Sequence, residues 1–386
     1  MQITPRECLQ QYAHILQNTL FGTLECELGP LPEAARLLIA VLEMIPLSRH
    51  LTPSRGWIGR PSKDRQALAG AFIAKAVYGL QTTRHLIERL KADRQLRLLC
   101  GWNNARSIPH EATFSRVFGE FARTELPQRL HEALVLKTQR DRLVGHIARD
   151  STAIEAREKF PETKPAQAKR QRRPKRARAS ERGTRLERQR RQTLAEQLAG
   201  LPKECSIGVK ANSKGHRQYW RGYKLHLDVA DGQIPISALL TGASVHDSQA
   251  AIPMMTMTTA RVTYLYDLMD AAYDAAAIRE HSVQLGHRPI TDHPRRYRKT
   301  GERKVPLRKN SRSWKRVIEK ELRAEEMTWA EQDRFRERTM VERVFSRLKD
   351  EFGFRSVRVR GASKVMAHLM FGVVALTVDQ LLKLTG

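Results

Sequence analysis

The sequence predicts an α/β protein in which a mixed five-stranded sheet, flanked by helices, follows a helical N-terminal domain. Residues 32–137 carry apolar residues at helical spacing and few β-branched runs. After Asp141, short β-branched segments alternate with helical ones. Residues 334–353 form a long amphipathic stretch without Gly or Pro before its last residue. We therefore expect two domains, over residues 1–140 and 141–386.

The helical domain is predicted from its clearest periodic segments, ALAGAFIAKAVYGL at 67–80 and HLIERLKADRQLRLLCGW at 85–102. The residues Ser107, Ile108 and Pro109 interrupt this pattern, and EATFSRVFGEFARTEL at 111–126 begins another helix. Two arrangements fit this order equally well, a helix-turn-helix unit or a plain helical bundle with a basic surface.

The second domain is predicted from alternating strands and helices. The first strand is RLVGHIARDSTAI, with Asp150 at or near its end, and RGYKLHLDVA and IPISALLTGA follow around the turn residues DGQ. We then expect a helix in HDSQAAIPMMTM, a strand in RVTYLYDLMD, a helix closed by Gly286 and a short strand in RPITDH. Three strands in meander followed by helix and strand in alternation describe a mixed sheet. The apolar run Val365–Val378 is expected to be a buried helix.

Composition favours a nucleic-acid partner in a reducing compartment. The formal net charge is +28, from 69 Lys and Arg against 41 Asp and Glu, which suits a polyanion. The start MQITPRECLQ lacks a hydrophobic signal region, and the run at Val365–Val378 is interrupted by His368, so we expect no membrane partner. The four cysteines lack CxxC spacing, which argues against a disulfide framework and against a cysteine zinc site. We therefore expect a cytoplasmic protein.

Two strongly basic segments interrupt the predicted sheet domain, at about 156–206 and 294–330. Lys164–Gln192 holds 13 Lys or Arg against two Glu, and Arg295–Arg323 holds 13 against three. Such segments repel themselves when free, so local mobility is one interpretation. The other is that both contact DNA phosphates, which would position a duplex without reading its sequence.

Three carboxylates on three predicted elements are candidates for metal chemistry. Asp150 lies in the first strand, Asp270 follows the fourth strand, and Glu342 lies on the long helix. Asp267 and Asp274 compete with Asp270 by position alone. Carboxylate oxygens are hard ligands suited to Mg²⁺, and two such ions roughly 4 Å apart stabilise the attacking and leaving oxygens of a displacement at phosphorus.

The long helix carries a second pattern beside its apolar stripe. Val341, Phe345, Leu348 and Phe352 form that stripe, whereas Phe335, Arg338, Glu342 and Lys349 lie about a quarter turn away. The cations on this second face can serve a bound phosphate. They can also simply form intrahelical pairs, since Arg338 and Glu342 are four residues apart.

These residues resemble the DDE transposases of bacterial insertion sequences, in the branch with the signature Y-x2-R-x3-E-x6-K. Phe335, Arg338, Glu342 and Lys349 reproduce every spacing, with Phe in place of Tyr. The segments ARDST, WRGYKLHL, TGASVHDS and DAAYD are similar to the motifs of the core strands, and DAAYD selects Asp270 over Asp267. The run from GRPSKDRQALAGAF to IPHEATFSRVFGEF is similar to the helical domain that precedes the core, so the resemblance extends from about Gly59 onward.

This resemblance implies an RNase H-like catalytic core and a two-ion Mg²⁺ site, with Mn²⁺ as a substitute, held by Asp150, Asp270 and Glu342. It also implies that Arg338, Lys349 and Phe335 contact DNA, although Phe335 lacks the hydroxyl of the family's Tyr. The substrate would be double-stranded DNA, namely the transposon ends and a target, cut and joined by a homodimer at the nucleoid. The N-terminal domain would then serve DNA binding and dimerisation.

Other functions fit parts of the same sequence. A non-catalytic DNA-binding protein would keep the charge and fold without using the carboxylates, and an RNase H-like nuclease would cut without joining. His226, His246 and Asp247 near the predicted core also suggest general-base catalysis, but a metal-activated water does not require it. We expect His226 on a strand face and His246 with Asp247 at a helix start.

Overall fold

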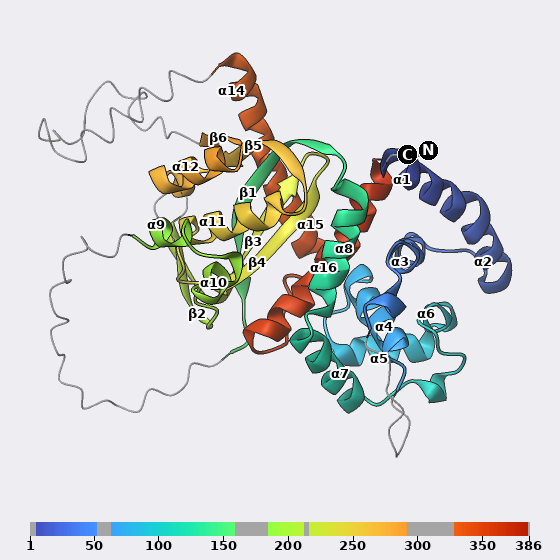
Figure 1. The fold of residues 1–386 in the computed structure, drawn as a ribbon. Helices are drawn as coiled ribbons and strands as arrows, with labels where there is room; N and C mark the ends of the chain where they lie inside the picture. The colour runs from blue at the N-terminus through green and yellow to red at the C-terminus, as the bar shows by residue number, and fades with distance from the viewer. Residues whose placement is uncertain (1–4, 52–62, 159–183, 212–215, 292–327, 385–386) are drawn as a thin grey trace, which may run out of the picture.

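The computed structural model describes residues 5–51, 63–158, 184–211, 216–291 and 328–384. Most of the basic segments at 159–183 and 292–327 lie outside these residues, so their predicted roles stay predictions. The described chain forms a helical part and a sheet part, with α16 and α8 side by side between them (Figure 1).

The N-terminal part is helical, as the periodic apolar pattern predicted. Its elements pack around one another as a bundle: α1 (Pro5–Ile15), the π turn η1 (Leu16–Leu20), α2 (Phe21–Leu28), α3 (Glu33–Met44), η2 (Leu47–Arg49), α4 (Arg65–Val77), α5 (Thr83–Ala92), α6 (Arg94–Leu99), η3 (Ala105–Ser107), α7 (Glu111–Arg123) and α8 (Leu126–Gln139). Side chains at the N-caps fix where several helices begin. Asp64 accepts from the backbone N–H of Gln66 at α4, and Thr82 accepts from that of His85 at α5.

The second part is built on a six-stranded mixed sheet. Its strands are β1 (Leu143–Glu155), β2 (Ser206–Ala211), β3 (Arg217–Ala230), β4 (Ile234–Gly242), β5 (Thr263–Met269) and β6 (Arg288–Thr291). The order is β2-β3-β1-β5-β6, and β4 pairs with the second half of β3. β1 is antiparallel to β3 and parallel to β5, and β5 is parallel to β6.

The sequence predicted five strands, and the sheet has one strand more. The missed strand, β2, begins at Ser206, where the predicted basic insertion ends, and it pairs with the first half of β3. β3 itself begins four residues before the predicted Arg221, which gives β2 its partner. Gly222 lies where β1 and β3 approach each other closely. Its φ is +151°, and a Cβ there would stand 2.0 Å from the carbonyl oxygen of Ile154.

Helices complete the sheet part: α9 (Arg185–Gln189), α10 (Leu194–Ala199), α11 (Ser248–Thr259), η4 (Ala271–Tyr273), α12 (Ala276–Gln284), α14 (Trp329–Arg336), η5 (Glu337–Thr339), α15 (Met340–Asp350) and α16 (Ala362–Lys383). The long helix expected over 334–353 is therefore interrupted by one 3₁₀ turn. All of its predicted apolar stripe is buried, at Val341, Phe345, Leu348 and Phe352.

The two faces of the sheet are covered by different helices. Ala148 and Leu268 on one face share a core with Val341 and Leu348 of α15. Met269 on the other face packs with α11 and α12. Because side chains alternate along a strand, this assigns each strand residue near the centre to the α15 face or to the α11 face.

The C-terminal helix α16 joins the two parts through one continuous core. Val365, Leu369 and Val373 pack with the α15 cluster, whereas Phe371, Val374 and Val378 pack with the N-terminal helices. By length and composition α16 could cross a membrane, but 78% of its apolar window is buried inside the protein. The expectation of a buried helix at Val365–Val378 is therefore confirmed.

Candidate active site

Asp150 and Asp270 extend from the same end of a parallel strand pair. β1 and β5 pair in register up to Arg149 opposite Met269, and the two aspartates are the next residues along each chain. Ala148 and Leu268, two residues earlier, both face α15, so alternation turns both carboxylates toward the same face. Asp150 was expected at or near the end of its strand, but β3 continues to pair with β1 as far as Glu155, so Asp150 lies within β1.

The carboxyl group of Asp150 lies in a site that disfavours its charge. Burial raises its pKa to about 6, although the backbone N–H of Ser151 donates to Oδ1 over 2.7 Å. The negative charge of Asp270 raises this pKa further, and the guanidinium of Arg338 lowers it. Asp150 is thus a desolvated carboxylate beside a second carboxylate, which is the electrostatic setting that a cation relieves.

Asp270 begins the 3₁₀ turn η4 and accepts a hydrogen bond from the backbone N–H of Ala272 over 2.9 Å. Its two sequence competitors are engaged elsewhere. Asp267 is fully buried on the opposite face and pairs with Arg149 over 3.2 Å. Asp274 forms an ion pair with Arg279 of α12. Of the three, Asp270 therefore has the position beside Asp150.

Glu342 lies in the first turn of α15, with 56% of its side chain exposed. It pairs with Arg338 over 3.2 Å, and the charge of Arg338 also acts on Asp150. The guanidinium of Arg338 lies over the ring of Phe335 at 5.9 Å. Within the described residues, no three His, Cys, Asp or Glu side chains are grouped closely enough to hold a metal ion. Arg338 thus interacts electrostatically with both Asp150 and Glu342.

Lys349 lies farther along α15, toward the end of β1. Burial is the main effect that lowers the pKa of Lys349, and the positive charges of Arg355 and Lys210 lower it further. Glu155 is one of the acidic residues near Lys349. Arg338 is therefore near Asp150, whereas Lys349 is near Glu155, five residues later on the same strand. Arg338 in η5 and Lys349 in α15 therefore lie near successive positions of β1.

Beneath Asp150, the α11 face of the sheet holds a buried ionic network. Arg149 donates to both oxygens of Asp228 over 2.7 Å and to Asp267 over 3.2 Å. Although burial opposes its charge, these two carboxylates raise the pKa of Arg149. Thr258 and Ser282 add hydroxyl donors to Asp228 and Asp267, each over 2.6 Å. Such a network fixes the strands that carry Asp150 and Asp270 relative to each other.

A smaller polar cluster lies next to this network on the α11 face of the sheet, around Ser151, the residue after Asp150. Asp247 accepts hydrogen bonds from Ser151 Oγ over 2.8 Å and from Lys224 Nζ over 2.9 Å. Burial lowers the pKa of His226 to about 4, so the imidazole is neutral at pH 7. Lys224 is therefore the cation that pairs with Asp247 at this pH. Asp247 stands at the N-cap of α11, as expected, but its side chain caps nothing there.

Sequence reasoning missed the roles of Lys224 and Ser151. The alternation of Lys224, His226 and Asp228 along β3 was visible in the sequence. It indicates one polar face on the half of the strand from Tyr223 to Ala230, whose other residues are apolar, and that pattern could have identified the buried polar layer.

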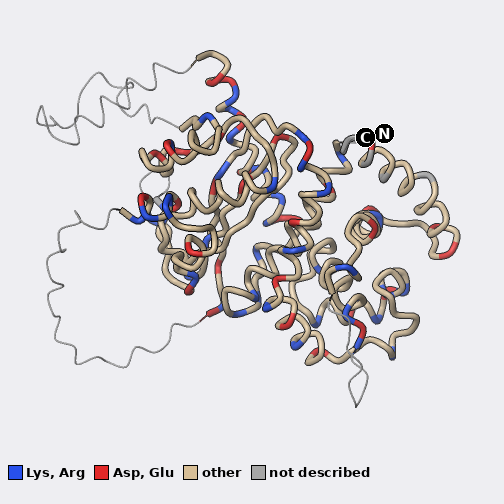
Figure 2. The backbone as a smooth tube through the Cα atoms, viewed as in Figure 1, with Lys and Arg blue, Asp and Glu red and all other residues tan. Residues whose placement is uncertain are grey.

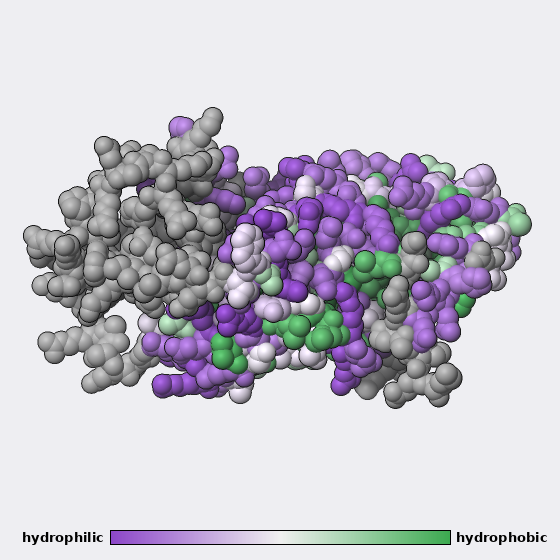
Figure 3. Space-filling model, turned by 90° about the horizontal axis from the view of Figure 1, so that it is seen from above, coloured by the Kyte–Doolittle hydropathy of each residue, from purple (hydrophilic) through white to green (hydrophobic). Residues whose placement is uncertain are grey.

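Basic side chains occur in both parts of the described chain, interspersed with acidic ones (Figure 2). The face seen in Figure 3 is mainly hydrophilic where it is described, with apolar residues in small groups. Large exposed apolar side chains include Ile207, Val209 and Tyr219 on β2 and β3.

Comparison with known protein families is consistent with this fold. Residues 144–378 match the family described as transposase DDE domain, and residues 28–120 match a family described as transposase domain (DUF772). Curated proteins and solved structures give no significant match. These two families define a transposase of the insertion-sequence type. Since the first match spans more than half of the chain, the protein belongs to the transposase DDE domain family.

Proposed function

We propose that this transposase binds the terminal inverted repeats of its own element and catalyses metal-dependent DNA cleavage and strand transfer. Water would first open the phosphodiester at the element's end, and the freed 3′-hydroxyl would then attack target DNA. The observation that carries this proposal is the position of Asp150 and Asp270 directly after Arg149 and Met269, the last paired residues of the parallel strands β1 and β5. The raised pKa of Asp150 supports it, because a buried carboxylate beside a like charge needs a cation.

The donor set fits Mg²⁺, with Mn²⁺ as a substitute. Asp150, Asp270 and Glu342 supply only hard carboxylate oxygens, and the first two share one face of the sheet. Two bound ions would supply electrostatic stabilisation of the attacking and leaving oxygens at phosphorus. Glu342 would join the aspartates after releasing Arg338, its ion-pair partner in the protein without DNA.

Arg338 has the central part in this proposal. In the absence of substrate it acts as an internal counter-cation, paired with Glu342 and lowering the pKa of Asp150. A DNA phosphate would take the place of Glu342 as the partner of Arg338, drawing the guanidinium away from Glu342 through charge-assisted hydrogen bonds. Lys349 would bind a phosphate farther along α15. Phe335 would stack or pack against DNA without the hydrogen bond that a Tyr hydroxyl offers.

The remaining features of the proposal concern architecture. The spacing of Phe335, Arg338, Glu342 and Lys349 supports the branch with the Y-x2-R-x3-E-x6-K signature. A meander of β1, β3 and β4 with β5 and β6 parallel to β1 supports an RNase H-like core over residues 141–386. We further propose that residues 1–140 bind DNA ends and dimerise, and that a homodimer pairs two ends at the cytoplasmic nucleoid.

The test is incubation of the purified full chain with Mg²⁺ and linear DNA that carries the element's ends and flanking sequence. We expect end-specific nicks and joined products for the wild type. Asp150→Asn, Asp270→Asn and Glu342→Gln should bind the same DNA but lose cleavage. Asp333→Asn, an equal charge change at a side chain 78% exposed, is the matched control and should cut normally.

Three results would contradict the proposal: no end-specific nick by the wild type, cleavage that persists in Asp150→Asn, or nicked ends that are never joined to a target. The last result would indicate a nuclease without strand transfer.

A further inference from the structure

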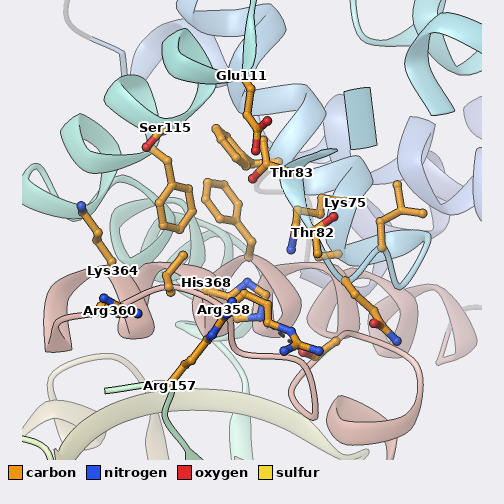
Figure 4. Close-up of a pocket in the computed structure, with 18 of the residues that line it drawn as sticks. Lys75, Thr82, Thr83, Glu111, Ser115, Arg157, Arg358, Arg360, Lys364 and His368 are labelled. Carbon is orange, nitrogen blue, oxygen red and sulfur yellow. Dashed lines mark hydrogen bonds between the residues drawn. The ribbon is translucent and has the colours of Figure 1, made fainter. Parts of the chain in front are cut away.

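A cavity of about 690 Å³ lies between the helical bundle and the C-terminal helix, away from the carboxylates. It is bordered by α4, α7, the start of α5, α16 and the segment that follows α15 (Figure 4). Its apolar lining is aromatic, from Phe72, Phe118, Phe352 and Phe371. The rings of Phe72 and Phe371 stack with centroids 5.9 Å apart. This volume and flat apolar lining suit a planar ring of nucleobase size.

The lining is also strongly cationic. Lys75, Arg157, Arg358, Arg360 and Lys364 all border the cavity. Within the described part of the chain, none of the five forms an ion pair or a hydrogen bond through its side chain. The single carboxylate of the lining, Glu111, pairs with Arg84 over 3.6 Å. No acidic group of the described protein balances the charge of these five cations. An anionic ligand in the cavity would balance it.

Lys75 is the strongest indication of a ligand. Its side chain is only 8% exposed, and burial lowers its pKa to about 8. It is charged at pH 7 and lies beside the imidazole of His368, which burial keeps neutral. Its nitrogen lies on the cavity side of α4 (Figure 4). A buried ammonium without a partner is costly, and a phosphate in the cavity would relieve that cost.

We propose that this cavity binds a nucleotide of a DNA strand, with its phosphate against the cations and its base against the phenylalanine rings. This inference rests on the proposed function, because it assigns the ligand to the enzyme's DNA. The hydroxyls of Thr83 and Ser115 also border the cavity and add neutral donors. A cavity lined by both cations and aromatic rings distinguishes a nucleotide from a bare anion.

The cavity is a second DNA contact, separate from the cleavage site. Arg157 follows Asp150 by seven residues, most of them in the extended β1, so the cavity lies roughly 20 Å from Asp150 at about 3.3 Å per residue. That separation corresponds to roughly six base steps of a DNA strand at 3.4 Å each. A nucleotide held there would fix how far the cleaved end extends past the carboxylates.

The experiment titrates the full chain in EDTA, so that metal-dependent cleavage is silent. The probes are thymidine 5′-monophosphate, a single-stranded thymidine tetranucleotide, thymidine and inorganic phosphate. Their binding is measured by isothermal titration calorimetry at low ionic strength. We expect the monophosphate to bind, the tetranucleotide to bind more tightly, and thymidine and inorganic phosphate to bind at least about tenfold more weakly than the monophosphate.

The variants separate this cavity from general charge. Lys75→Met and the pair Arg358→Gln with Arg360→Gln should each weaken monophosphate binding by about tenfold or more. The matched control is Arg94→Gln with Arg106→Gln, two exposed arginines outside the cavity lining. It should change the affinity by less than about twofold. Thermal unfolding of Lys75→Met checks that its loss of binding does not come from loss of the fold.

Four results would overturn the proposal: no binding of the monophosphate, equal weakening by the control pair, equal affinity for inorganic phosphate, or binding of the monophosphate without the tetranucleotide. The last would assign the cavity to a free nucleotide and not to DNA. Asp150→Asn should bind both probes normally. A wild type that cuts DNA ends but binds no nucleotide would refute this inference alone, and one that binds nucleotide but cuts nothing would refute the proposed function alone.

Discussion

Replacement of Lys75 by methionine should stabilise the protein at neutral pH. The ammonium of Lys75 is desolvated and has no acidic partner among the described residues, whereas a methionine of similar length buries without that cost. Burial lowers the pKa of Lys75 from 10.5 to about 8. At 1.36 kcal/mol for each pKa unit, the charged form costs the folded state about 3 kcal/mol.

Because the pKa of Lys75 is lower in the folded protein than in the unfolded chain, the stability difference between wild type and Lys75→Met depends on pH. Between pH 8 and 10.5 the unfolded chain holds the Lys75 proton and the folded protein does not. The wild type therefore gains stability relative to Lys75→Met as the pH rises through this range. The advantage of the variant should be about 3 kcal/mol at pH 7 and below about 1 kcal/mol near pH 10.

The assay is denaturant unfolding of both proteins at pH 7 and near pH 10, with the free energy of unfolding as the measured quantity. Lys364→Met is the control, because Lys364 borders the same cavity but is exposed, and its effect should be within about 0.5 kcal/mol. A Lys75→Met protein that is less stable at pH 7, or whose advantage is the same at both pH values, would refute the reasoning.

Three further predictions concern the active site. Mg²⁺ should raise the Tm of the wild type but not of the Asp150→Asn, Asp270→Asn double variant, and equal shifts in thermal denaturation would contradict the metal assignment. Arg149→Met should lower the free energy of unfolding by about 3 to 5 kcal/mol in denaturant titrations, since it leaves Asp228 buried without its cation; a loss below about 1 kcal/mol would show that the network is not stabilising. Asp267→Asn should destabilise the protein more than Asp270→Asn does, because Asp267 is fully buried against Arg149; the opposite order in the same titration would exchange their roles.

Local patterns predicted the elements well because each depends on near neighbours in the chain. The alternation in RGYKLHLDVA and the apolar spacing at Val341, Phe345 and Leu348 set a strand and a buried helix face, and both are present. The short strand β2 was missed because it has only six residues and directly follows the predicted insertion, and only pairing with β3 makes it a strand.

The choice between Asp267 and Asp270 shows where local reasoning reaches its limit. Both occur within four residues, and the motif DAAYD favoured Asp270 only by resemblance. The structure distinguishes them physically, because alternation turns Asp267 toward Arg149 and Asp270 toward the α15 face. The ion pair of Arg338 with Glu342 was foreseen from their spacing, but its reach to Asp150 depends on how α15 lies over the sheet.

The sequence by itself determined the charge of the protein and, apart from β2, the order of its strands and helices, since these follow from composition and short-range periodicity. The choice of acidic residues for a metal rested on the family resemblance. Only the tertiary structure decided that Asp150 and Asp270 adjoin, and that Arg149 forms ion pairs in the layer beneath them. It also decided that Lys75 is buried with no counter-charge from the part of the chain that the structure describes. These properties depend on desolvation and on distances between residues far apart in the chain. No local pattern encodes such quantities.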